Sequence, residues 1–565
     1  MCAGHLFDAF KIPKLQLPAA MDQAHALVAI AGAAVITHLV FKRWEPTNIG
    51  ILALLLLALP MGLSTLLLPH YGPLLAPLVA LAAFHAAMLA SIALYRVSPW
   101  HPLANYPGPL LAKLSKWWLV WKERHGKQHL YIQELHEQYG DVVRIGPNDI
   151  SIRDVEAIVP LMGLKGLPKG PAPWGAPIEP SVVPLIGIRD NAEHARRRRP
   201  WARAFAAEAL KGYEPMLTRR LAQLVDKLGS QQGAVDLSIW LSYFSHDFMG
   251  DMIYGGGHEL LANGDANGIW AMFRAAAEGQ MMAHHLPWLT TFTSLLPASP
   301  GLQKMRSVAL RRTMARYANG SDKKDLFHYL SNEDNAEKIS PPPEQLVTET
   351  VLAVFTSSET VAMILSNVFW QLLQHPQYYK QLQTEVDRYY PAGENAYDTK
   401  NYDKMVWLDA VLNEALRLYP ITPSGSQRAP APGRGDRIVG PYVIPEGTNA
   451  RVHTWSLHRD PRYFANPNAF WPERWLVAGG HASAPAGEGF VHDARAFVPY
   501  SVGPMGCVGR DLAELEMRMV LCALVQKLQF APAEGWDPAE RERTLRDEFV
   551  VCMRGPVSVV VSKRT

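Results

Sequence analysis

Cys507 stands in a glycine-rich loop whose residue types could hold a metal-bound cofactor. Residues 500–510 read YSVGPMGCVGR, and a helical pattern follows over residues 511–528. Glycines let the backbone approach a flat ligand closely, and backbone N–H groups at the start of a helix favour a thiolate anion. A thiolate in this setting is what a haem iron needs as an axial ligand. Taken alone, the loop also allows an inert, buried cysteine at the beginning of a helix.

Glu414 and Arg417 lie three positions apart in the helical pattern of residues 406–419 and therefore share a helix face. An exposed pair of this kind contributes little to stability, but apolar neighbours on both sides indicate burial. A buried pair usually needs a further partner, and Arg474, in the run FWPERW, is the candidate. Removing one member of such a cluster should cost about 3–5 kcal/mol, because a buried charge loses its partner.

A long helix is predicted over residues 340–375. Ser340 is a good N-cap, the three prolines after it suit a first turn, and no helix breaker follows before residue 375. Such a helix spans on the order of 50 Å, enough to cross a whole domain. Its middle reads TSSET and places the acid Glu359 directly before the hydroxyl of Thr360. An exposed polar helix face is the alternative interpretation.

These motifs, in this order, resemble the cytochrome P450 family. Residues 106–109 (YPGP) resemble its proline-rich hinge, and residues 139–148 resemble a strand that enters the first hairpin of fungal members. Residues 458–461 (HRDP) and the aromatic stretch after them match the irregular segment before the cysteine loop. The resemblance runs from about residue 102 to the C-terminus. It implies a mainly α fold with small β-sheets, preceded by N-terminal transmembrane helices.

The resemblance implies a role for each motif. Cys507 would be the axial ligand of haem b, and Glu414, Arg417 and Arg474 would form a structural cluster on the proximal side of the haem. Glu359 and Thr360 would match the acid–alcohol pair that relays protons to iron-bound dioxygen, where the long helix is locally opened. The usual Ala-Gly of that helix is Thr-Ser at residues 356–357 in this chain.

The haem propionates need cationic partners. His194 and Arg198 lie at i and i+4 on one helix face and match the family's propionate ligands, while Arg428 lies near the position of a further one. Part of the basic run 196–199 is expected to be a solvated face that could dock an acidic partner. Met505 stands where the family usually has an arginine; one lost charged hydrogen bond costs roughly 1.5–3 kcal/mol. Haem binding is expected to persist, and weaker haem retention is the alternative.

Composition agrees with a large domain and a membrane segment. The 565 residues are 48% hydrophobic, and the net charge of +3 is too small to indicate nucleic-acid binding. The four cysteines, Cys2, Cys507, Cys522 and Cys552, form no disulfide framework, which suits a reducing compartment.

Three apolar segments, at about residues 24–41, 49–68 and 74–94, are each near the length that crosses a bilayer. We expect residues 1–98 to be a membrane anchor with up to three transmembrane helices, and residues 99–565 to be the catalytic domain. Three crossings put Lys42, Arg43 and Arg96 on one side, which satisfies the positive-inside rule for a cytosolic catalytic domain on the endoplasmic reticulum. The sequon at Asn319 would then stay unmodified.

The expected function is a haem-thiolate monooxygenase that inserts one oxygen atom of O2 into an apolar small molecule, such as a secondary metabolite, a terpenoid or an aromatic xenobiotic. Electrons would come from a membrane-bound NADPH–cytochrome P450 reductase, with cytochrome b5 as a second candidate donor. Residues 181–188, 281–296 and 421–426, with the middle of the long helix, are expected to form the substrate pocket. The alternatives are an oxygen-independent isomerase or dehydratase, and a non-catalytic haem-binding membrane protein.

Overall fold

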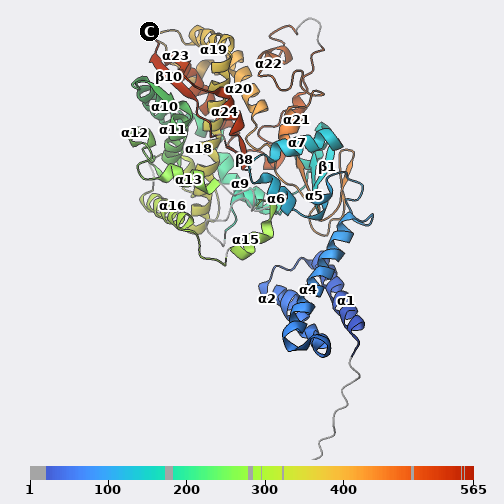
Figure 1. Cartoon of the computed structure of the whole chain (residues 1–565). Helices are drawn as coiled ribbons and strands as arrows, with labels where there is room; N and C mark the ends of the chain where they lie inside the picture. Colours follow the sequence, from blue (N-terminus) through green and yellow to red (C-terminus); the bar gives the residue numbers. More distant parts are fainter. Residues whose placement is uncertain are drawn as a thin grey trace, which may run out of the picture. The chain divides into compact units, whose positions relative to one another are not determined.

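The computed structural model describes residues 21–171, 182–277, 284–293, 295–320, 323–484, 489–548, 550–552 and 554–564. Contacts divide the chain into two compact units, Met1–Ala104 and Asn105–Thr565 (Figure 1).

The first unit is helical. Helix α1 (Gln23–Trp44) is followed by one helical stretch, Ile49–Val97, which comprises α2 (Ile49–Ala53), a π-helical turn (Leu54–Ala58), α3 (Leu59–Leu63), a 3-10 turn (Ser64–Leu67) and α4 (Leu68–Val97). The stretch is kinked at Gly72, whose φ of 69° interrupts the helix between the second and third expected segments. At every fourth residue α1 and α4 face each other: Ala26, Ile30 and Ala34 pack with Ala76, Ala80 and Phe84. The alanines allow the two helices to approach closely.

Three helical stretches among the described residues are long and apolar enough to cross a membrane: α1, Ile49–Val97 and α18 (Pro343–Gln374). The most apolar part of α18 is 61% buried inside the protein, so α18 is a core helix of the second unit. The two N-terminal stretches are mostly unburied and apolar, which is compatible with membrane anchoring.

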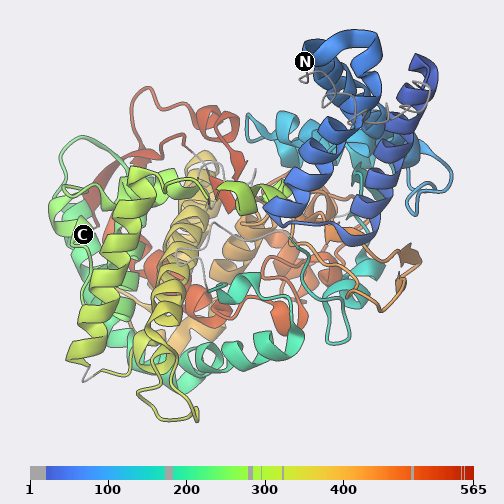
Figure 2. The ribbon, with the colours of Figure 1, turned by 90° about the horizontal axis from the view of Figure 1, so that it is seen from below.

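Helix α18 is the central element of the second unit. It packs against α11 (Leu237–Tyr254), α20 (Val406–Leu418) and α23 (Arg510–Lys527), and α16 (Pro300–Asn319) lies alongside it (Figure 2). The N-cap expected at Ser340 is wrong, because the helix begins at Pro343 with Pro342 as its N-cap. A residue that precedes a proline is held out of the helical region, so the run of prolines delays the helix; the Ser340 hydroxyl instead accepts a hydrogen bond from Asn332 at 3.2 Å.

The remaining helices surround this core, so that the unit is mainly α. They are α5 (Leu110–Leu114), α6 (Trp117–Glu123), α7 (Gln128–Tyr139), α8 (Ile158–Met162), α9 (Asn191–Ala204), α10 (Ala207–Gly229), α12 (Leu260–Asn263), α13 (Ile269–Ala277), α15 (Pro287–Thr293), α17 (Leu326–Leu330), α19 (Pro376–Tyr389), α21 (Thr454–His458), α22 (Glu473–Ala478) and α24 (Pro538–Arg543).

The β-sheets are small, as predicted. Strands β1 (Val142–Gly146) and β2 (Asp149–Ile152) form the expected antiparallel hairpin, and β6 (Asn449–Val452) adds parallel to β2. The other sheets are short and antiparallel: β3 (Ala234–Asp236), β10 (Ser558–Lys563) and β7 (Leu528–Pro532) in that order, β4 (Arg437–Val439) with β5 (Tyr442–Ile444), and β8 (Arg546–Glu548) with β9 (Val550–Cys552).

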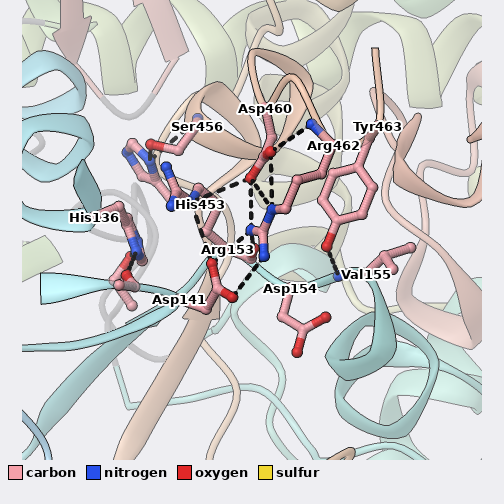
Figure 3. A network of polar contacts seen from close by, with 12 residues as sticks. His136, Asp141, Arg153, Asp154, Val155, His453, Ser456, Asp460, Arg462 and Tyr463 are labelled. Carbon is pink, nitrogen blue, oxygen red and sulfur yellow. Dashed lines mark hydrogen bonds and ion pairs between the residues drawn. The ribbon is translucent and has the colours of Figure 1, made fainter. Parts of the chain in front are cut away.

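A charged network joins the first hairpin to the segment after α21 (Figure 3). Arg462 donates to both carboxylate oxygens of Asp141, at 2.8 and 2.6 Å, and to Asp460 at 2.7 Å. Arg153 adds an ion pair to Asp460 at 3.3 Å. Because Asp460 is almost fully buried, two arginines are needed to neutralise the two acids, and the network fixes the HRDP segment against the sheet.

Candidate functional site

The Cys507 loop adopts a shape that its glycines permit. A 3-10 turn, Gly503–Met505, precedes the cysteine, and α23 begins three residues after it. Gly503 has a φ of 73°, and a Cβ atom there would lie 2.3 Å from the carbonyl oxygen of Met162, so this position requires glycine. The backbone N–H of Cys507 donates to Tyr500 at 2.9 Å. Cys507 forms no disulfide, and its exposed surface lines the adjoining cavity.

The three residues of the expected ion cluster come together in the fully buried interior. Glu414 accepts hydrogen bonds from Arg417 at 2.9 and 2.7 Å and from Arg474 at 3.1 Å. The backbone N–H of Trp471 and the indole N–H of Trp475 also donate to Glu414, at 2.9 and 3.0 Å. The carboxylate therefore accepts five hydrogen bonds, which replace the water that a buried charge has lost.

His458 links this cluster to the stretch that leads into the cysteine loop. Its Nε2 accepts a hydrogen bond from the backbone N–H of Val498 at 3.1 Å, so Nδ1 carries the proton and donates to the carbonyl of Arg417 at 3.0 Å. Burial lowers the pKa of His458 to about 3, so the ring stays neutral and keeps this tautomer. The His458 ring thus connects the Glu414–Arg417–Arg474 cluster to the backbone just before the cysteine loop.

A cavity of about 300 Å³ lies beside Cys507. Helix α18 contributes three hydroxyls to its wall, those of Thr356, Ser357 and Thr360. The rest of the wall is mostly apolar, and includes Leu185, Ile186, Leu352, Val361, Ile364 and Ile421. The expected pocket segments contribute Leu185, Ile186, His284, Ile421, Thr422 and Ser426 to the wall. Residues 181, 281–283 and 294 of those segments lie outside the described residues.

The expected propionate ligands His194, Arg198 and Arg428 all line this cavity. His194 and Arg198 project from α9, whose N-cap Asp190 accepts from the backbone N–H of Glu193 at 2.7 Å. Arg198 also donates to the carbonyl of Gly506 at 2.8 Å and so joins α9 to the cysteine loop. Arg428 is 1% exposed, and its Nε lacks a hydrogen-bond partner among the described residues.

The electrostatics of the cavity favour an anionic ligand. Burial, with the charges of Lys169, Arg198 and Arg428, lowers the pKa of His194 to about 4, and burial lowers that of Arg428 to about 10. Burial raises the pKa of the Cys507 thiol, against the Gly509 N–H and the nearby arginines. Cationic side chains and a free cysteine that line one cavity fit a haem, which carries two carboxylates and an iron.

The basic run 196–199 divides between two roles. Arg196 and Arg199 are exposed, as expected of a solvated face, whereas Arg197 is buried and pairs with Glu349 of α18. A four-residue charge run on a helix covers a full turn, so one member must face the core.

Glu359 and Thr360 point in different directions. Thr360 lines the cavity, while Glu359 accepts hydrogen bonds from His246 of α11 at 2.9 Å and from Trp270 of α13 at 3.1 Å. Burial acts to raise the pKa of Glu359, but the His246 hydrogen bond and nearby positive charges lower it below its ordinary value. The expected local opening of α18 is absent, since Pro343–Gln374 forms one uninterrupted helix. The Thr356 and Thr360 hydroxyls each donate to the carbonyl four residues earlier.

Two ionisable residues of the cavity wall, Lys169 and Glu516, were not identified from the sequence, whereas His284 lies in an expected pocket segment. Glu516 is 1% exposed and accepts from the Ser245 hydroxyl at 2.9 Å, and burial raises its pKa to about 8. Its spacing from Leu512 and Val520 at four-residue intervals placed it on the apolar face of α23, a signal that could have identified it. Met505 also lines the cavity.

Comparison with known proteins decides the family. The sequence model of the family described as Cytochrome P450 matches residues 107–558. The chain belongs to the cytochrome P450 family. This P450 is 32% identical to Cytochrome P450 67 of Uromyces fabae over 94% of the chain and 98% of that protein. It is also 32% identical to the cytochrome P450 monooxygenase FCK2 of Fusarium pseudograminearum, over 85% of each chain, and 28% identical to tryprostatin B 6-hydroxylase of Aspergillus fumigatus, over 81% and 80%.

This cytochrome P450 is therefore an enzyme of the monooxygenase class, as predicted. The family resemblance and the mainly α fold with small sheets are confirmed. The family implies a thiolate-ligated haem, a small-molecule substrate and a redox partner.

Proposed function

We propose that the cavity beside Cys507 binds haem b, with Cys507 as the axial thiolate and His194, Arg198 and Arg428 around the propionates. The observation that carries this proposal is the convergence of the four side chains, from three separate segments, on one cavity that α18 also lines. When bound, the haem supplies the oxygen activation that protein side chains lack.

Thr360 and Glu359 divide the handling of protons. The Thr360 hydroxyl donates to the carbonyl of Thr356 at 2.7 Å, so its oxygen can still accept a hydrogen bond from a donor in the cavity. Rotation about its Cβ–Oγ1 bond turns the same hydroxyl into a donor toward the cavity. Glu359, one-quarter exposed and hydrogen-bonded to His246, exchanges protons with solvent on the other side of α18.

The substrate is an apolar small molecule, with a secondary metabolite, a terpenoid or an aromatic xenobiotic as the candidate classes. Apolar side chains dominate the cavity wall, and a few hydroxyls, among them those of Ser357 and Thr422, can orient a polar substituent. One relative, tryprostatin B 6-hydroxylase, carries in its name the hydroxylation of a small molecule. Oxygen insertion into a C–H bond or double bond is the reaction that we assign to this chain.

The electron donor is an NADPH–cytochrome P450 reductase, with cytochrome b5 as a second donor. The exposed arginines Arg196, Arg199 and Arg510, two on α9 and one at the start of α23, offer positive charge to an acidic partner. Residues 1–98 anchor the protein in the endoplasmic reticulum membrane by up to three crossings, and residues 99–565 form the catalytic domain in the cytosol. The division of contacts at Ala104 supports a boundary near residue 98.

The carbon monoxide difference spectrum of dithionite-reduced membranes tests the haem site. The far-red-shifted Soret band of a thiolate ligand is expected for wild type and should be lost in Cys507→Ala. Absence of the band from expressed wild-type protein would favour the non-catalytic alternative. Turnover that needs neither NADPH nor reductase would instead favour the oxygen-independent isomerase or dehydratase.

A further inference from the structure

Lys169 is held directly opposite Arg428 by a short ladder of backbone hydrogen bonds. The N–H of Gly170 donates to the carbonyl of Gln427 at 3.1 Å, and the N–H of Ala429 donates to the carbonyl of Pro168 at 3.0 Å. Residues directly opposite in an antiparallel pair project their side chains to the same face. Lys169 and Arg428 form such a bridge, and both line the cavity beside Cys507.

The surroundings fix this ladder on both sides. Arg428 also exchanges two backbone hydrogen bonds of 2.8 Å with Ala450 of β6, so the bridge extends the β1–β2–β6 sheet. Gly170 lies so close to Gln427 that a Cβ atom would approach the Gln427 Cβ to 2.7 Å. A glycine is therefore needed beside Lys169, and the lysine position is set by the fold rather than by a flexible loop.

The charge around Lys169 is unbalanced. Arg198 and Arg428 line the same cavity, and Glu349, the acid whose charge acts on Lys169, is already paired with Arg197. The Lys169 ammonium donates to the carbonyl of Leu185 at 3.1 Å, which leaves two of its three N–H donors for a ligand. Burial and the charges of Arg428 and Arg198 lower the pKa of Lys169 to about 7. A bound anion would restore the charged form.

Met505 lines this cavity but carries no charge, at the position where the family usually has an arginine. We infer that Lys169 contacts a haem propionate and so compensates for the charged contact that Met505 cannot make. The inference rests on the proposed haem site. It predicts that haem retention depends on Lys169, and that a charge at residue 505 can substitute for it.

The test is the rate at which haem leaves the detergent-solubilised full-length protein for excess apomyoglobin, measured for four forms. Lys169→Met should release haem on the order of ten times faster than wild type or more, as expected for a lost charged hydrogen bond. Lys165→Met, an exposed lysine of the same segment, should match wild type. Lys169→Met combined with Met505→Arg should return the rate to within a few-fold of wild type.

The double variant separates charge from structure. If Lys169 only held the segment through Leu185, an arginine at residue 505 would not restore haem retention, and that outcome would overturn the inference. Equal rates for Lys169→Met and wild type would overturn it as well. The haem reduction potential gives a second readout: loss of a nearby positive charge favours ferric haem, so Lys169→Met should lower the potential. A wild-type protein without the thiolate band would instead refute the haem site itself.

Discussion

Arg197 of α9 forms an ion pair with Glu349 of α18, and both side chains are more than nine-tenths buried. The neighbours of Arg197 on α9, His194 and Arg198, line the cavity, as does Thr360 on α18. The pair therefore couples the helix that carries two of the candidate propionate ligands to the helix that carries the candidate proton donor. Arg197 also donates to the carbonyl of Val183 at 2.9 Å, which fixes the adjoining wall segment.

Arg197→Met should destabilise the folded enzyme by about 3–5 kcal/mol, because Glu349 would remain buried without its partner. The double variant Arg197→Met with Glu349→Met should cost less than the single one. Arg196→Met is the matched control, since Arg196 is 53% exposed. The measurement is the temperature at which membranes lose the thiolate carbon monoxide band. A single variant as stable as the control would contradict the coupling role.

Glu414→Gln should also cost about 3–5 kcal/mol, because Arg417 and Arg474 would lose the carboxylate that neutralises them in the fully buried interior. The same thermal measurement applies. Asp537→Asn is the control: Asp537 pairs with Arg543 at the surface, where an ion pair contributes at most about 1 kcal/mol, and asparagine keeps the N-cap of α24. Similar losses for both variants would argue against a buried cluster.

Thr360→Ala should lower product formation about a hundredfold and leave the carbon monoxide band intact, because the cavity loses a proton-donating hydroxyl but keeps its cofactor ligands. Thr348→Ala is the control: the Thr348 hydroxyl makes the same type of bond to the carbonyl four residues earlier, at 3.0 Å, outside the cavity. Product formation from a substrate of the protein, with reductase and NADPH, is the readout. Equal rates for the two variants would exclude Thr360 from proton transfer.

Glu516 should make stability fall as pH rises. Its pKa is raised to about 8 in the folded state and is about 4.3 in an unfolded chain, so between these values the folded state holds the extra proton. Stability is then lost toward pH 8, by at most about 1.4 kcal/mol per pH unit. Glu516→Gln should remove this loss, so its melting temperature should gain on wild type between pH 5.5 and pH 8. Parallel curves would show that Glu516 does not titrate in this window.

The number of membrane crossings can be read from glycosylation. With a cytosolic catalytic domain, an odd number of crossings puts the N-terminus in the lumen, and an even number keeps it in the cytosol. A sequon-bearing tag added before residue 1 should therefore be glycosylated if the helical stretch 49–97 crosses twice through its kink at Gly72, and unmodified if it crosses once. Asn319 should carry no glycan in either case, and a glycan there would reverse the orientation. Endoglycosidase sensitivity on gels gives the readout.

The sequence by itself determined the family and the local elements. The order of the motifs around Glu414, Arg474 and Cys507 identified a cytochrome P450, and the hairpin of β1 and β2 followed from a strand, a turn and a returning strand close together in the chain. These features depend on residues close together in the chain, where spacing alone fixes which side chains share a face. The first turn of α18 was misjudged because a good cap was followed by prolines whose steric effect on the preceding residue was stronger.

The tertiary structure decided which side chains reach the cavity. Lys169 lies there because its segment pairs with the distant residues 427–429, and Glu359 turns away because α11 and α13 offer it donors. Arg197 points into the core within a run that reads as uniformly basic. Pairing between distant segments and the burial of charge depend on how all the elements pack, so no local pattern contains them.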